Sequence, residues 1–595
     1  MKQKIRSEIN EQDTWDLTVI YKNESEFYKD YNDLKNEIKE VLTYKGKILL
    51  SSKNLLSFLE LSDKLERKLY KLYYYAHLNF DVDTTNSKSL ELLGKVQALM
   101  TEYSSLVSFV EPEFLKGDYQ KINEYLQEEK ELLKYKFNLE KLYRYKKHTL
   151  NESEEHLLST LNEALSASSE IYESLTDSDL TFPSILVDSK KVEFTESNYS
   201  TFIESNDRNL RKKAFNILYK TYSKYLNTIA NTFRFNIESI SKIAKLKHYN
   251  SSIEASLFHD NIDLSVYNNL IETVNKNLDV LYDYYDLKKE VLKLDEIHLY
   301  DIYAGMVSDI NKNYTFNEAR EIVLDGLSIL GDDYKDKLNK AFSERYIDIY
   351  NNKGKRSGAY SSGFYDTNPY ILLNFEGNYT DVTTLAHELG HSMHTMYSCL
   401  NNPYNTSSYQ IFVAEVASTV NELLLLKHLL KNTNVKEEKL FLLNKLLELF
   451  KGTIFRQTMF AEFEKNMYES HEKGFVLTSE YISQEYFKLV KKYFGPRVKC
   501  DKLIKYEWMR IPHFYYNFYV YKYAIGLSAA CKIVSDIETT GKIDKYIDFL
   551  KTGGSMYPED ELLVCDVNIQ SPKFIEDAIL MFKNTIQEFR EIYRK

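Results

Sequence analysis

The stretch TDVTTLAHELGHSMHTMYS, residues Thr380–Ser398, contains two histidines four residues apart, His387 and His391. On a helix, side chains at positions i and i+4 lie on one face, so these imidazoles can share a metal ion. Glu388 then lies beside the first histidine, where it can hold and deprotonate a metal-bound water. The alternative is two surface histidines beside an ordinary acid. Because the chain has only 12 histidines in 595 residues, the pattern rarely arises by accident, and we expect a metal-binding helix.

A catalytic zinc site usually needs a third protein ligand and leaves a fourth position open. The strongest candidate is Glu415 in FVAEVASTVNE, 24 residues beyond His391 and at the start of an apolar-periodic helix. The polar stretch NNPYNTSSYQ lets that helix fold back beside the first. Glu422 follows two turns later on roughly the same face, and we expect it to support a metal-bound histidine. Asn421 and Glu422 also imitate a thermolysin-type ligand motif, but its Ser-Asp pair is missing.

Two neighbouring positions exclude a different class of zinc peptidase. That class takes its third ligand from HExxHxxGxxH, whereas here His394 stands at the glycine and Tyr397 at the last histidine. We therefore expect His394 to be a packed neighbour of the metal site rather than a ligand.

The composition favours a mostly α-helical fold. With 18 glycines and 8 prolines the chain has few helix breakers, and 43% apolar residues suffice for a substantial core. Apolar groups recur at three- and four-residue spacing from Asp13 to about Asp177, and again from Asp207 onward. Between these regions, LTFPSILVDSKKVEFTESNY predicts a turn and a small strand or hairpin. We place a boundary there, between an N-terminal helical lobe of residues 1–195 and a catalytic domain of residues 196–595.

A glycine-rich region precedes the metal helix. In NNKGKRSGAYSSGFYDTNPYILLNFEGNYTD, the compact run PYILLNF is bounded by turn signals and predicts a strand. We expect Thr380 or Asp381 to cap the following helix. The strand would form one wall of a cleft, where an extended peptide could pair with its free edge through backbone hydrogen bonds. A small buried sheet without a ligand is the alternative.

The net charge and the cysteine spacing indicate which partners and which cellular compartment to expect. The net charge of −11 and pI near 5.7 argue against a nucleic-acid surface. The four cysteines lack CxxC spacing and indicate thiols in a reducing compartment. MKQKIRSEINEQDTWDL lacks the apolar core of a signal peptide, and no run of 18 apolar residues occurs. We therefore expect a soluble cytoplasmic protein that binds neither nucleic acid nor membrane. Its oligomeric state is left open.

Several motifs point to one family when they are taken together. They are HELGH, FVAEVAS about two dozen residues later, RQTMFAEFE at Arg456–Glu464, PHFYYNFYVYKYAIG from Pro512, WDL at Trp15–Leu17 and DRNLRKKAF at Asp207. This set resembles oligoendopeptidase F, a branch of the thimet oligopeptidase superfamily of zinc peptidases. The resemblance covers most of the chain. It implies a mostly helical, two-lobed fold that encloses a deep channel with zinc at its floor. It also implies intracellular hydrolysis of short peptides and exclusion of folded proteins.

The resemblance further implies roles for a histidine and two tyrosines. In the superfamily, a histidine and a Tyr-x-x-Tyr pair reach over the metal and hydrogen-bond the substrate carbonyl and the oxyanion. His513, Tyr516 and Tyr519 match these best, and the spacing predicts that Tyr516, Tyr519 and Tyr523 share one helical face. The thimet branch has a glycine-rich loop that HFYYNFYVYKY lacks, so which tyrosines face the zinc stays open. Core packing is the alternative for each of them.

The hypothesis is a zinc-dependent endopeptidase that cuts internal bonds of short unstructured peptides. The two HELGH histidines and Glu415 would hold one zinc ion (Zn²⁺) per chain. Glu388 would take a proton as water attacks and then pass it to the leaving amine. His513 with Tyr516 or Tyr519 would donate to the oxyanion.

Two alternatives remain beside the endopeptidase. A metallocarboxypeptidase or peptidyl-dipeptidase on the same fold needs a cation for the substrate's terminal carboxylate, and Lys353, Lys355, Arg356 or Arg510 could supply it. A non-catalytic peptide-binding shell would use the same channel without turnover. The intact Glu388 and the complete ligand set argue against that shell.

Overall fold

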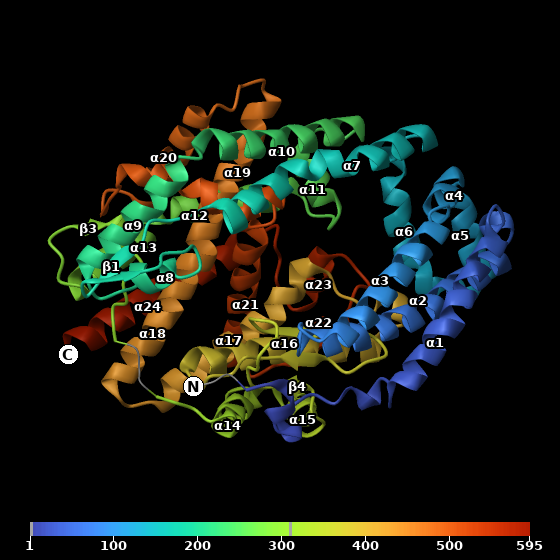
Figure 1. Ribbon diagram of the computed structural model, residues 1–595, viewed down its shortest axis with the longest axis horizontal. Helices are drawn as coiled ribbons and strands as arrows, with labels where there is room; N and C mark the ends of the chain where they lie inside the picture. Colours follow the sequence, from blue (N-terminus) through green and yellow to red (C-terminus); the bar gives the residue numbers. More distant parts are fainter. Residues whose placement is uncertain (1–3, 309–311) are drawn as a thin grey trace. The chain divides into compact units, whose positions relative to one another are not determined.

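The computed structural model describes residues 4–308 and 312–595, most of which lie in helices (Figure 1). The chain folds into two compact units, each built from three segments of sequence. Unit 1 contains Met1–Lys147, Asn311–His428 and Ile533–Asp566. Unit 2 contains His148–Ile310, Leu429–Lys532 and Val567–Lys595. The predicted helical fold with small sheets is confirmed. The sequence predicts an N-terminal lobe of residues 1–195 and a catalytic domain of residues 196–595. This division stays a prediction.

Unit 1 contains helices from all three of its segments of sequence, together with a small sheet. Its helices are α1 Glu24–Glu37, α2 Ser52–Asp81, α3 Ser87–Leu106, α4 Val110–Lys116, α5 Tyr119–Glu128, α6 Lys136–Arg144, α14 Phe316–Gly326, α15 Asp332–Ser343, α16 Tyr379–Asn401, α22 Asp544–Lys551 and α23 Pro558–Val564, together with most of α17 Ile411–Asn432. Its strands are β4 Ile347–Asp348, β5 Tyr360–Ser362 and β6 Tyr370–Leu372.

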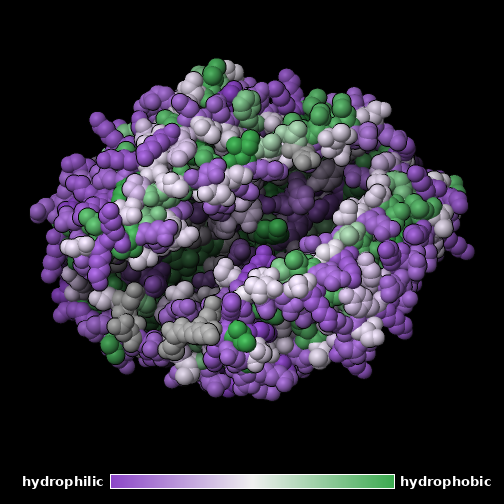
Figure 2. All heavy atoms as spheres, in the orientation of Figure 1, coloured by the Kyte–Doolittle hydropathy of each residue, from purple (hydrophilic) through white to green (hydrophobic). Residues whose placement is uncertain are grey.

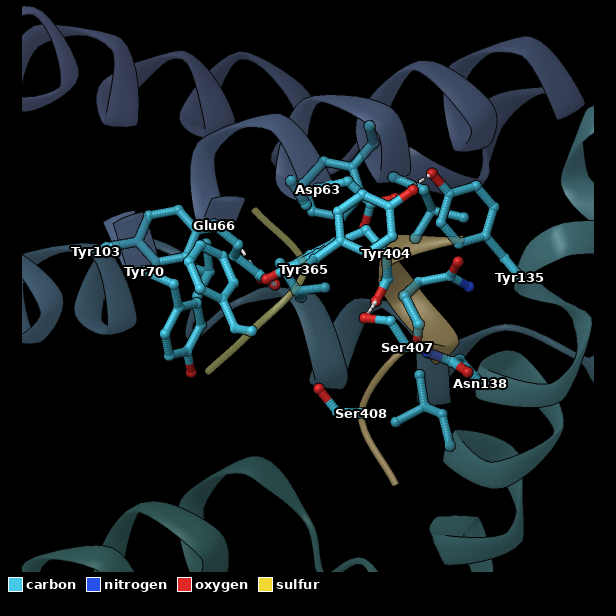
Figure 3. A pocket seen from close by; sticks show the side chains of 18 of the residues that line it. Asp63, Glu66, Tyr70, Tyr103, Tyr135, Asn138, Tyr365, Tyr404, Ser407 and Ser408 are labelled. Carbon is cyan, nitrogen blue, oxygen red and sulfur yellow. Dashed lines mark hydrogen bonds between the residues drawn. The ribbon is translucent and has the colours of Figure 1, made fainter. Parts of the chain in front are cut away.

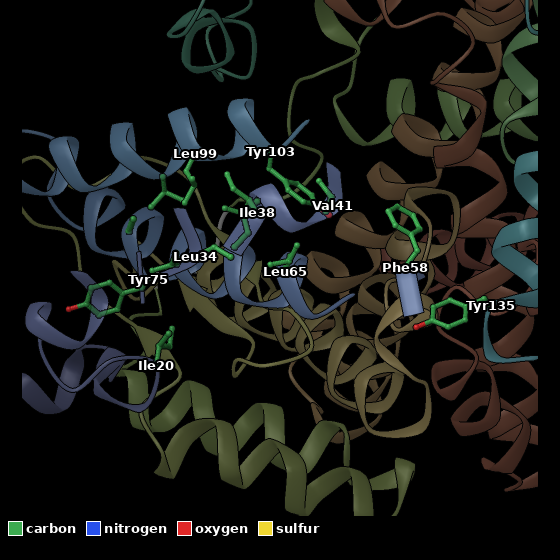
Figure 4. Packing of buried hydrophobic residues seen from close by; sticks show 14 of the residues in the cluster. Ile20, Leu34, Ile38, Val41, Phe58, Leu65, Tyr75, Leu99, Tyr103 and Tyr135 are labelled. Carbon is green, nitrogen blue, oxygen red and sulfur yellow. The ribbon is translucent and has the colours of Figure 1, made fainter. Parts of the chain in front are cut away.

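The core of unit 1 joins the N-terminal helices to the sheet. α2 places apolar side chains at helical spacing, and Leu65, Leu69 and Leu72 are at most 3% exposed. The same cluster contains side chains from α1 to α3, some of which Figure 4 shows, together with Tyr370 of β6. Trp15 packs edge-on against Tyr370, with ring centroids 6.0 Å apart. The N-terminal helices thus stabilise the strand that precedes the metal helix.

The sheet of unit 1 is built around β6. Strand β6 pairs in parallel with β4 and in antiparallel register with β5, so that Ser361 lies opposite Ile371. The predicted strand in PYILLNF is confirmed as β6, and α16 packs against both β5 and β6. The prediction that this strand offers its own free edge is wrong, because both of its sides are paired. Among the described strands of this sheet, β5 and β4 are the ones at an edge.

The metal helix α16 begins slightly earlier than predicted. Asn378 is the N-cap: its side chain accepts a hydrogen bond from the Asp381 amide, and the Asp381 carboxylate accepts from the Asn378 amide. The predicted caps Thr380 and Asp381 are therefore wrong as N-caps, although Asp381 completes the capping box. Within the helix, a Cβ on Gly390 would lie 2.6 Å from the backbone of Ser418. The glycine of HELGH thus allows the backbones of α16 and α17 to approach closely.

Unit 2 consists mainly of long helices. They are α7 Glu152–Glu173, α8 Tyr199–Ile203, α9 Arg208–Ser223, α10 Leu226–Leu246, α11 Ser252–Phe258, α12 Leu264–Lys276, α13 Leu278–Val291, α18 Lys436–Phe450, α19 Arg456–Glu472, α20 Ser479–Phe494, α24 Lys573–Arg594 and the first part of α21 Tyr521–Thr540. The predicted hairpin is confirmed as β1 Ile185–Val187 and β2 Lys190–Val192, which pair in antiparallel register. The short strands β3 Ile297–His298 and β7 Val498–Lys499 pair in parallel.

The protein surface is mostly hydrophilic on the face that Figure 2 shows, with apolar side chains scattered among hydrophilic ones. Among the residues that the structure describes, no helix is both long and apolar enough to cross a membrane. The four cysteines all lie within the described residues, and none of them forms a disulfide.

Candidate metal centre

Helices α16 and α17 bring three candidate ligands of unit 1 together. The Nε2 atoms of His387 and His391 lie 3.2 Å apart. Oε2 of Glu415 lies 3.6 Å from the first nitrogen and 3.8 Å from the second. Two ligand atoms about 2.1 Å from a zinc ion at the tetrahedral angle are about 3.4 Å apart. The triangle formed by these three atoms therefore fits a tetrahedral ion with one position open. Within the described part of the chain, His387, His391 and Glu415 form the one group of three or more such side chains whose ligand atoms lie close enough to share a metal ion.

Glu422, also on α17, orients one of the candidate ligands. Its Oε1 lies 2.5 Å from Nδ1 of His387, so the imidazole donates to it and turns Nε2 toward the triangle. Burial acts to lower the pKa of His387, whereas the Glu422 hydrogen bond and the neighbouring carboxylates together raise this pKa to about 9. Burial and the charge of His387 lower the pKa of His391 to about 4. The predicted support of a ligand histidine by Glu422 agrees with this contact.

Glu388 lies beside the triangle in an environment suited to proton transfer. Its side chain is 6% exposed, and burial, opposed in part by His387, raises the pKa of its carboxyl to about 7. The backbone of Ser361 on β5 hydrogen-bonds this carboxyl, while Oε2 is buried without a partner among the described residues. A carboxylate with a pKa near neutrality can accept a proton and return it efficiently.

His394 does not belong to the triangle. Its side chain is fully buried, and its ring stacks on that of Tyr409 with centroids 3.7 Å apart. Burial lowers the pKa of His394 to about 3, so the imidazole is neutral. The prediction that His394 is a packed neighbour rather than a ligand agrees with this geometry.

The histidine and tyrosines of the second predicted cluster gather in unit 2. Tyr523 Oη lies 3.5 Å from Nε2 of His513. The ring of His513 lies 5.6 Å from that of Tyr516, 6.4 Å from that of Tyr519 and 6.0 Å from that of Tyr523, centroid to centroid. Tyr515 instead stacks on Tyr172 and shares a hydrogen bond of 2.7 Å with Thr232. Core packing therefore accounts for Tyr515.

The backbone that carries this cluster differs from the predicted helix. Residues Pro512–Tyr515 form a single 3₁₀ turn, and the regular helix α21 begins only at Tyr521. Asn517 and Phe518 lie between them in the left-handed region, with φ of 50° and 59°. The prediction of a shared helical face for the tyrosines is wrong. Two consecutive left-handed residues reverse the chain locally, and this reversal gathers the rings.

Buried side chains that the sequence analysis missed hold this left-handed turn. Oδ1 of Asn517 accepts a hydrogen bond of 2.6 Å from Tyr468, and the Phe518 amide donates to Oε1 of Glu464 over 2.7 Å. Ser256 donates to the Asn517 carbonyl over 2.9 Å. Tyr468 and Glu464 lie on α19, about 50 residues before the turn. Glu464 is the last residue of the motif RQTMFAEFE, which contributed to the family resemblance. No spacing rule links this residue to the turn at Asn517 and Phe518.

The chain is similar to known peptidases over nearly its full length. The model of peptidase family M3 matches residues 201–580, and the oligopeptidase F model matches residues 113–182. Oligopeptidase PepF of Bacillus subtilis is 43% identical over 593 residues, which are 99% of this chain and 88% of that protein.

Two solved structures share both fold and sequence with the chain. A putative peptidase from Chlamydophila abortus has a TM-score of 0.94 at 37% identity, covering 99% of this chain and all of that one. Oligoendopeptidase F from Enterococcus faecium has a TM-score of 0.75 at 33% identity, covering 96% of this chain and 99% of that one.

Proposed function

The chain belongs to peptidase family M3 as a metalloendopeptidase of the oligoendopeptidase F type, and we propose that it uses zinc to cut internal bonds of short oligopeptides. One Zn²⁺ per chain would be held by His387, His391 and Glu415. The observation that carries the proposal is the ligand triangle, whose edges of 3.2, 3.6 and 3.8 Å match those of a tetrahedral site.

The proposed mechanism assigns the proton transfers to Glu388. When bound, zinc polarises the scissile carbonyl and makes water a stronger acid. Glu388 accepts the proton of the attacking water and then gives it to the leaving amine. A raised carboxyl pKa, to about 7, supports both directions of transfer. Glu422 keeps His387 in the tautomer whose Nε2 is available as a ligand.

In this proposal the second cluster stabilises the oxyanion. His513 and either Tyr516 or Tyr519 donate hydrogen bonds to the developing negative charge, where a positioned donor is most effective. Tyr516 is 51% exposed, and the ring of Tyr519 lies beside those of His513 and Tyr523. Both observations support these assignments over Tyr515.

The free edge of β5 offers the peptide a backbone template. β5 pairs with β6 on one side, so its other edge can accept an extended peptide by backbone hydrogen bonds. Ser361, in the middle of β5, also contacts Glu388 through its backbone and Ser392 of α16 through its hydroxyl at 2.8 Å. A peptide on β5 would therefore lie next to the proposed general base. Backbone pairing supports a broad choice of peptides rather than one sequence.

An endopeptidase is favoured over a carboxypeptidase because most candidate cations are already paired. The side chain of Lys355 is fully buried, and its Nζ lies 2.7 Å from Oδ1 of Asp348. Arg356 lies 3.1 Å from Asp81, and the guanidinium of Arg510 is bound to Glu196. Lys353 is the one of the four proposed cations with an exposed side chain and no ion pair within the described residues. A dedicated clamp for a terminal carboxylate thus has little support.

The proposal extends to the organisation and location of the protein. We propose that residues 196–595 form the catalytic domain and that residues 1–195 form the N-terminal lobe. A cytoplasmic location is supported by the absence of disulfides among the four described cysteines. Short unstructured peptides are the proposed substrates, with neither nucleic acid nor membrane as a partner.

The test uses an internally quenched peptide of about ten residues with an amidated C-terminus, a length that spans a cleft at about 3.3 Å per residue. We expect internal cleavage that a zinc chelator abolishes and added zinc restores, with the cut position read by mass spectrometry. A free-carboxylate version of the same peptide is the control. Cleavage of that version alone would identify a carboxypeptidase. An intact peptide in both forms, with zinc bound, would identify a peptide-binding protein.

A further inference from the structure

Unit 1 contains a cavity whose lining does not include the residues of the ligand triangle. Its volume is about 570 Å³, within the range of small-ligand sites. It is lined by α2, by α3, by the 3₁₀ segment Lys130–Tyr135 and by the segment that follows α16 (Figure 3). We call it the acid–tyrosine pocket and define it by six of its lining residues: Asp63, Glu66, Tyr70, Tyr103, Tyr135 and Tyr404.

The two acids of this pocket are bound by phenols and not by cations. Oε1 and Oε2 of Glu66 each lie 3.4 Å from a tyrosine hydroxyl, that of Tyr103 and that of Tyr404. Tyr135 donates to Asp63 over 2.7 Å. Among the described residues, neither acid takes part in an ion pair. Burial raises the pKa of both carboxyls, and the charge of Asp63 raises the pKa of Glu66 further. The pocket therefore contains two acids that no cation of the described chain neutralises directly.

The two basic side chains whose charges act on Asp63, Arg67 and Lys134, form ion pairs with other acids. Arg67 binds Asp366 through two hydrogen bonds of 2.8 and 2.6 Å, and its guanidinium covers the Tyr365 ring. Lys134 lies 2.9 Å from Glu60. These cations lower the pKa of Asp63 through space, but among the described residues neither acid has a cation as its direct partner. A ligand can supply the missing charge.

The remaining walls fit a cation on an apolar stem. Tyrosine rings line the cavity beside the acids, and an aromatic face attracts an ammonium or guanidinium group. Phe58, Leu139 and Leu142 also line the cavity. Such side chains pack against the methylene groups of a lysine or arginine while the charged end reaches the carboxylates. A free inorganic cation would not use these apolar walls.

The pocket continues the strand that is proposed to hold the peptide. Gly363 follows directly after β5 and lines the pocket, and Tyr74 donates to its carbonyl over 3.2 Å. Ser361, which contacts Glu388, lies only two residues earlier. Two residues of extended chain span about 7 Å. A peptide paired with β5 beside the general base would thus carry a nearby side chain to the pocket.

We propose that the acid–tyrosine pocket binds a lysine or arginine side chain of the peptide substrate, a few residues from the bond that is cut. This inference rests on the proposed endopeptidase function. It names a substrate class within that function: short peptides with a basic residue at a fixed distance from the cleavage site. The acids Asp63 and Glu66 would set the preference for charge, and the rings of Tyr103, Tyr135 and Tyr404 the preference for an extended cation.

The test measures binding to the Glu388→Gln variant, which should hold peptides without cutting them. The peptides are N-acetylated, C-amidated decamers in which one lysine is moved through the positions and is replaced by norleucine in the matched control. Norleucine keeps the stem and lacks the charge. We expect lysine to bind about tenfold more tightly than norleucine at one or two adjacent positions and equally elsewhere.

Substitutions within the pocket then locate the effect. Glu66→Gln and Asp63→Asn, each added to Glu388→Gln, should reduce the lysine preference to about twofold or less. Glu128→Gln is the matched control, because it removes the same charge from an exposed position on α5 outside the pocket. It should keep the full preference. Thermal melts verify that each variant is folded, and the lysine scan with the unaltered pocket remains decisive if a pocket variant does not fold.

Three results would overturn the inference. Equal binding of lysine and norleucine peptides at every position would exclude a basic-side-chain site, while cleavage by the wild-type protein would leave the endopeptidase function intact. A lysine preference unchanged in Glu66→Gln and Asp63→Asn would place the recognition elsewhere. One-to-one binding of spermidine that Glu66→Gln abolishes, without any lysine preference in peptides, would assign the pocket to a free amine instead. Failure of the wild-type protein to cleave any peptide would count against the proposed function itself.

Discussion

The ligand triangle of unit 1 and the His513–Tyr523 segment of unit 2 carry the two halves of the proposed chemistry on contrasting backbones. The triangle lies on two regular helices, α16 and α17, whose close approach is allowed by Gly390 and whose ligands follow helical spacing. The second segment contains a 3₁₀ turn, two left-handed residues and only then a helix. Its shape depends on α19 and α11, which are distant in sequence.

This difference predicts that activity should tolerate substitutions better in the second segment than in the ligand triangle. In the triangle, each role belongs to one side chain, and its loss removes a ligand or a base outright. In the second segment, several rings lie within about 6.5 Å of one another, and the backbone is held by partners outside the segment. We therefore expect graded effects there and abrupt effects in unit 1.

The largest effect is expected for Glu388→Gln. Glutamine keeps the size and the helix but cannot accept a proton, so kcat/KM should fall on the order of 10²- to 10⁴-fold while zinc content stays at one per chain. Metal analysis and turnover of the quenched peptide measure both quantities. Glu376→Gln, at an exposed position just before α16, is the matched control and should be close to wild type. Turnover near the wild-type rate in Glu388→Gln would remove this residue from the mechanism.

The contrast between the two regions also explains what could be predicted from the sequence. The helical fold, the β6 strand and the approach of Glu415 to the histidines follow from periodicity, because a regular helix turns spacing into direction. The cap at Asn378 was missed because several polar residues near it were equally suitable by type. The free edge was assigned to β6 rather than β5, because the residue pattern of a strand does not show which other strands pair with it.

The left-handed turn is the clearest example of what sequence patterns lack. Asn517 tolerates a positive φ, but Phe518 has no local reason to adopt one. Its conformation is held by Glu464 through the Phe518 amide and by Tyr468 through the Asn517 side chain. A spacing rule that assumes a helix therefore assigned the tyrosines to one face, whereas tertiary contacts decide where they lie. The acid–tyrosine pocket was missed for the same reason.

Tyr519→Phe tests whether a phenol of the second segment donates to the oxyanion. Loss of one such donor should reduce kcat by roughly ten- to a thousand-fold with a smaller change in KM. Tyr515→Phe is the matched control, because Tyr515 is a packed ring whose hydroxyl contacts Thr232. It should reduce stability by about 1 kcal/mol and leave kcat within about twofold. An unchanged kcat in Tyr519→Phe would transfer the role to Tyr516 or Tyr523.

Substitutions at Glu415 and Glu422 separate a ligand from its neighbour. Glu415→Ala should strip zinc from the protein, since two imidazoles alone hold the ion weakly. Glu422→Gln should keep the metal but weaken its affinity about 10- to 100-fold, because the His387 ring loses its charged acceptor. Zinc competition with a chelator of known affinity measures both. Full zinc occupancy and normal activity in Glu415→Ala would instead make Glu422 the third ligand.

Asn517→Ala should disturb the second segment without touching the metal. Alanine loses the hydrogen bond from Tyr468 and is strained at φ of 50°, by about 1–2 kcal/mol relative to a right-handed conformation. We expect kcat to fall about tenfold, with zinc affinity unchanged. Asn517→Gly keeps the left-handed backbone and removes the same side chain, so it should recover part of the lost rate. Equal rates in both variants would show that backbone strain at this position has no influence on the cluster.

The smallest effect on catalysis is expected for Glu464, whose ionisation should appear instead in the pH dependence of stability. Burial raises the pKa of Glu464 to about 8, whereas its unfolded value is about 4.5. Between these pH values the folded protein holds a proton that the unfolded chain has lost, so the unfolding free energy falls as the pH rises from about 5 to 8. Glu464→Gln keeps an acceptor for the Phe518 amide and cannot ionise. Urea unfolding at several pH values should therefore give a shallower decline for the variant. Parallel curves would mean that Glu464 does not carry the proton and that the left-handed turn is held by a charged carboxylate.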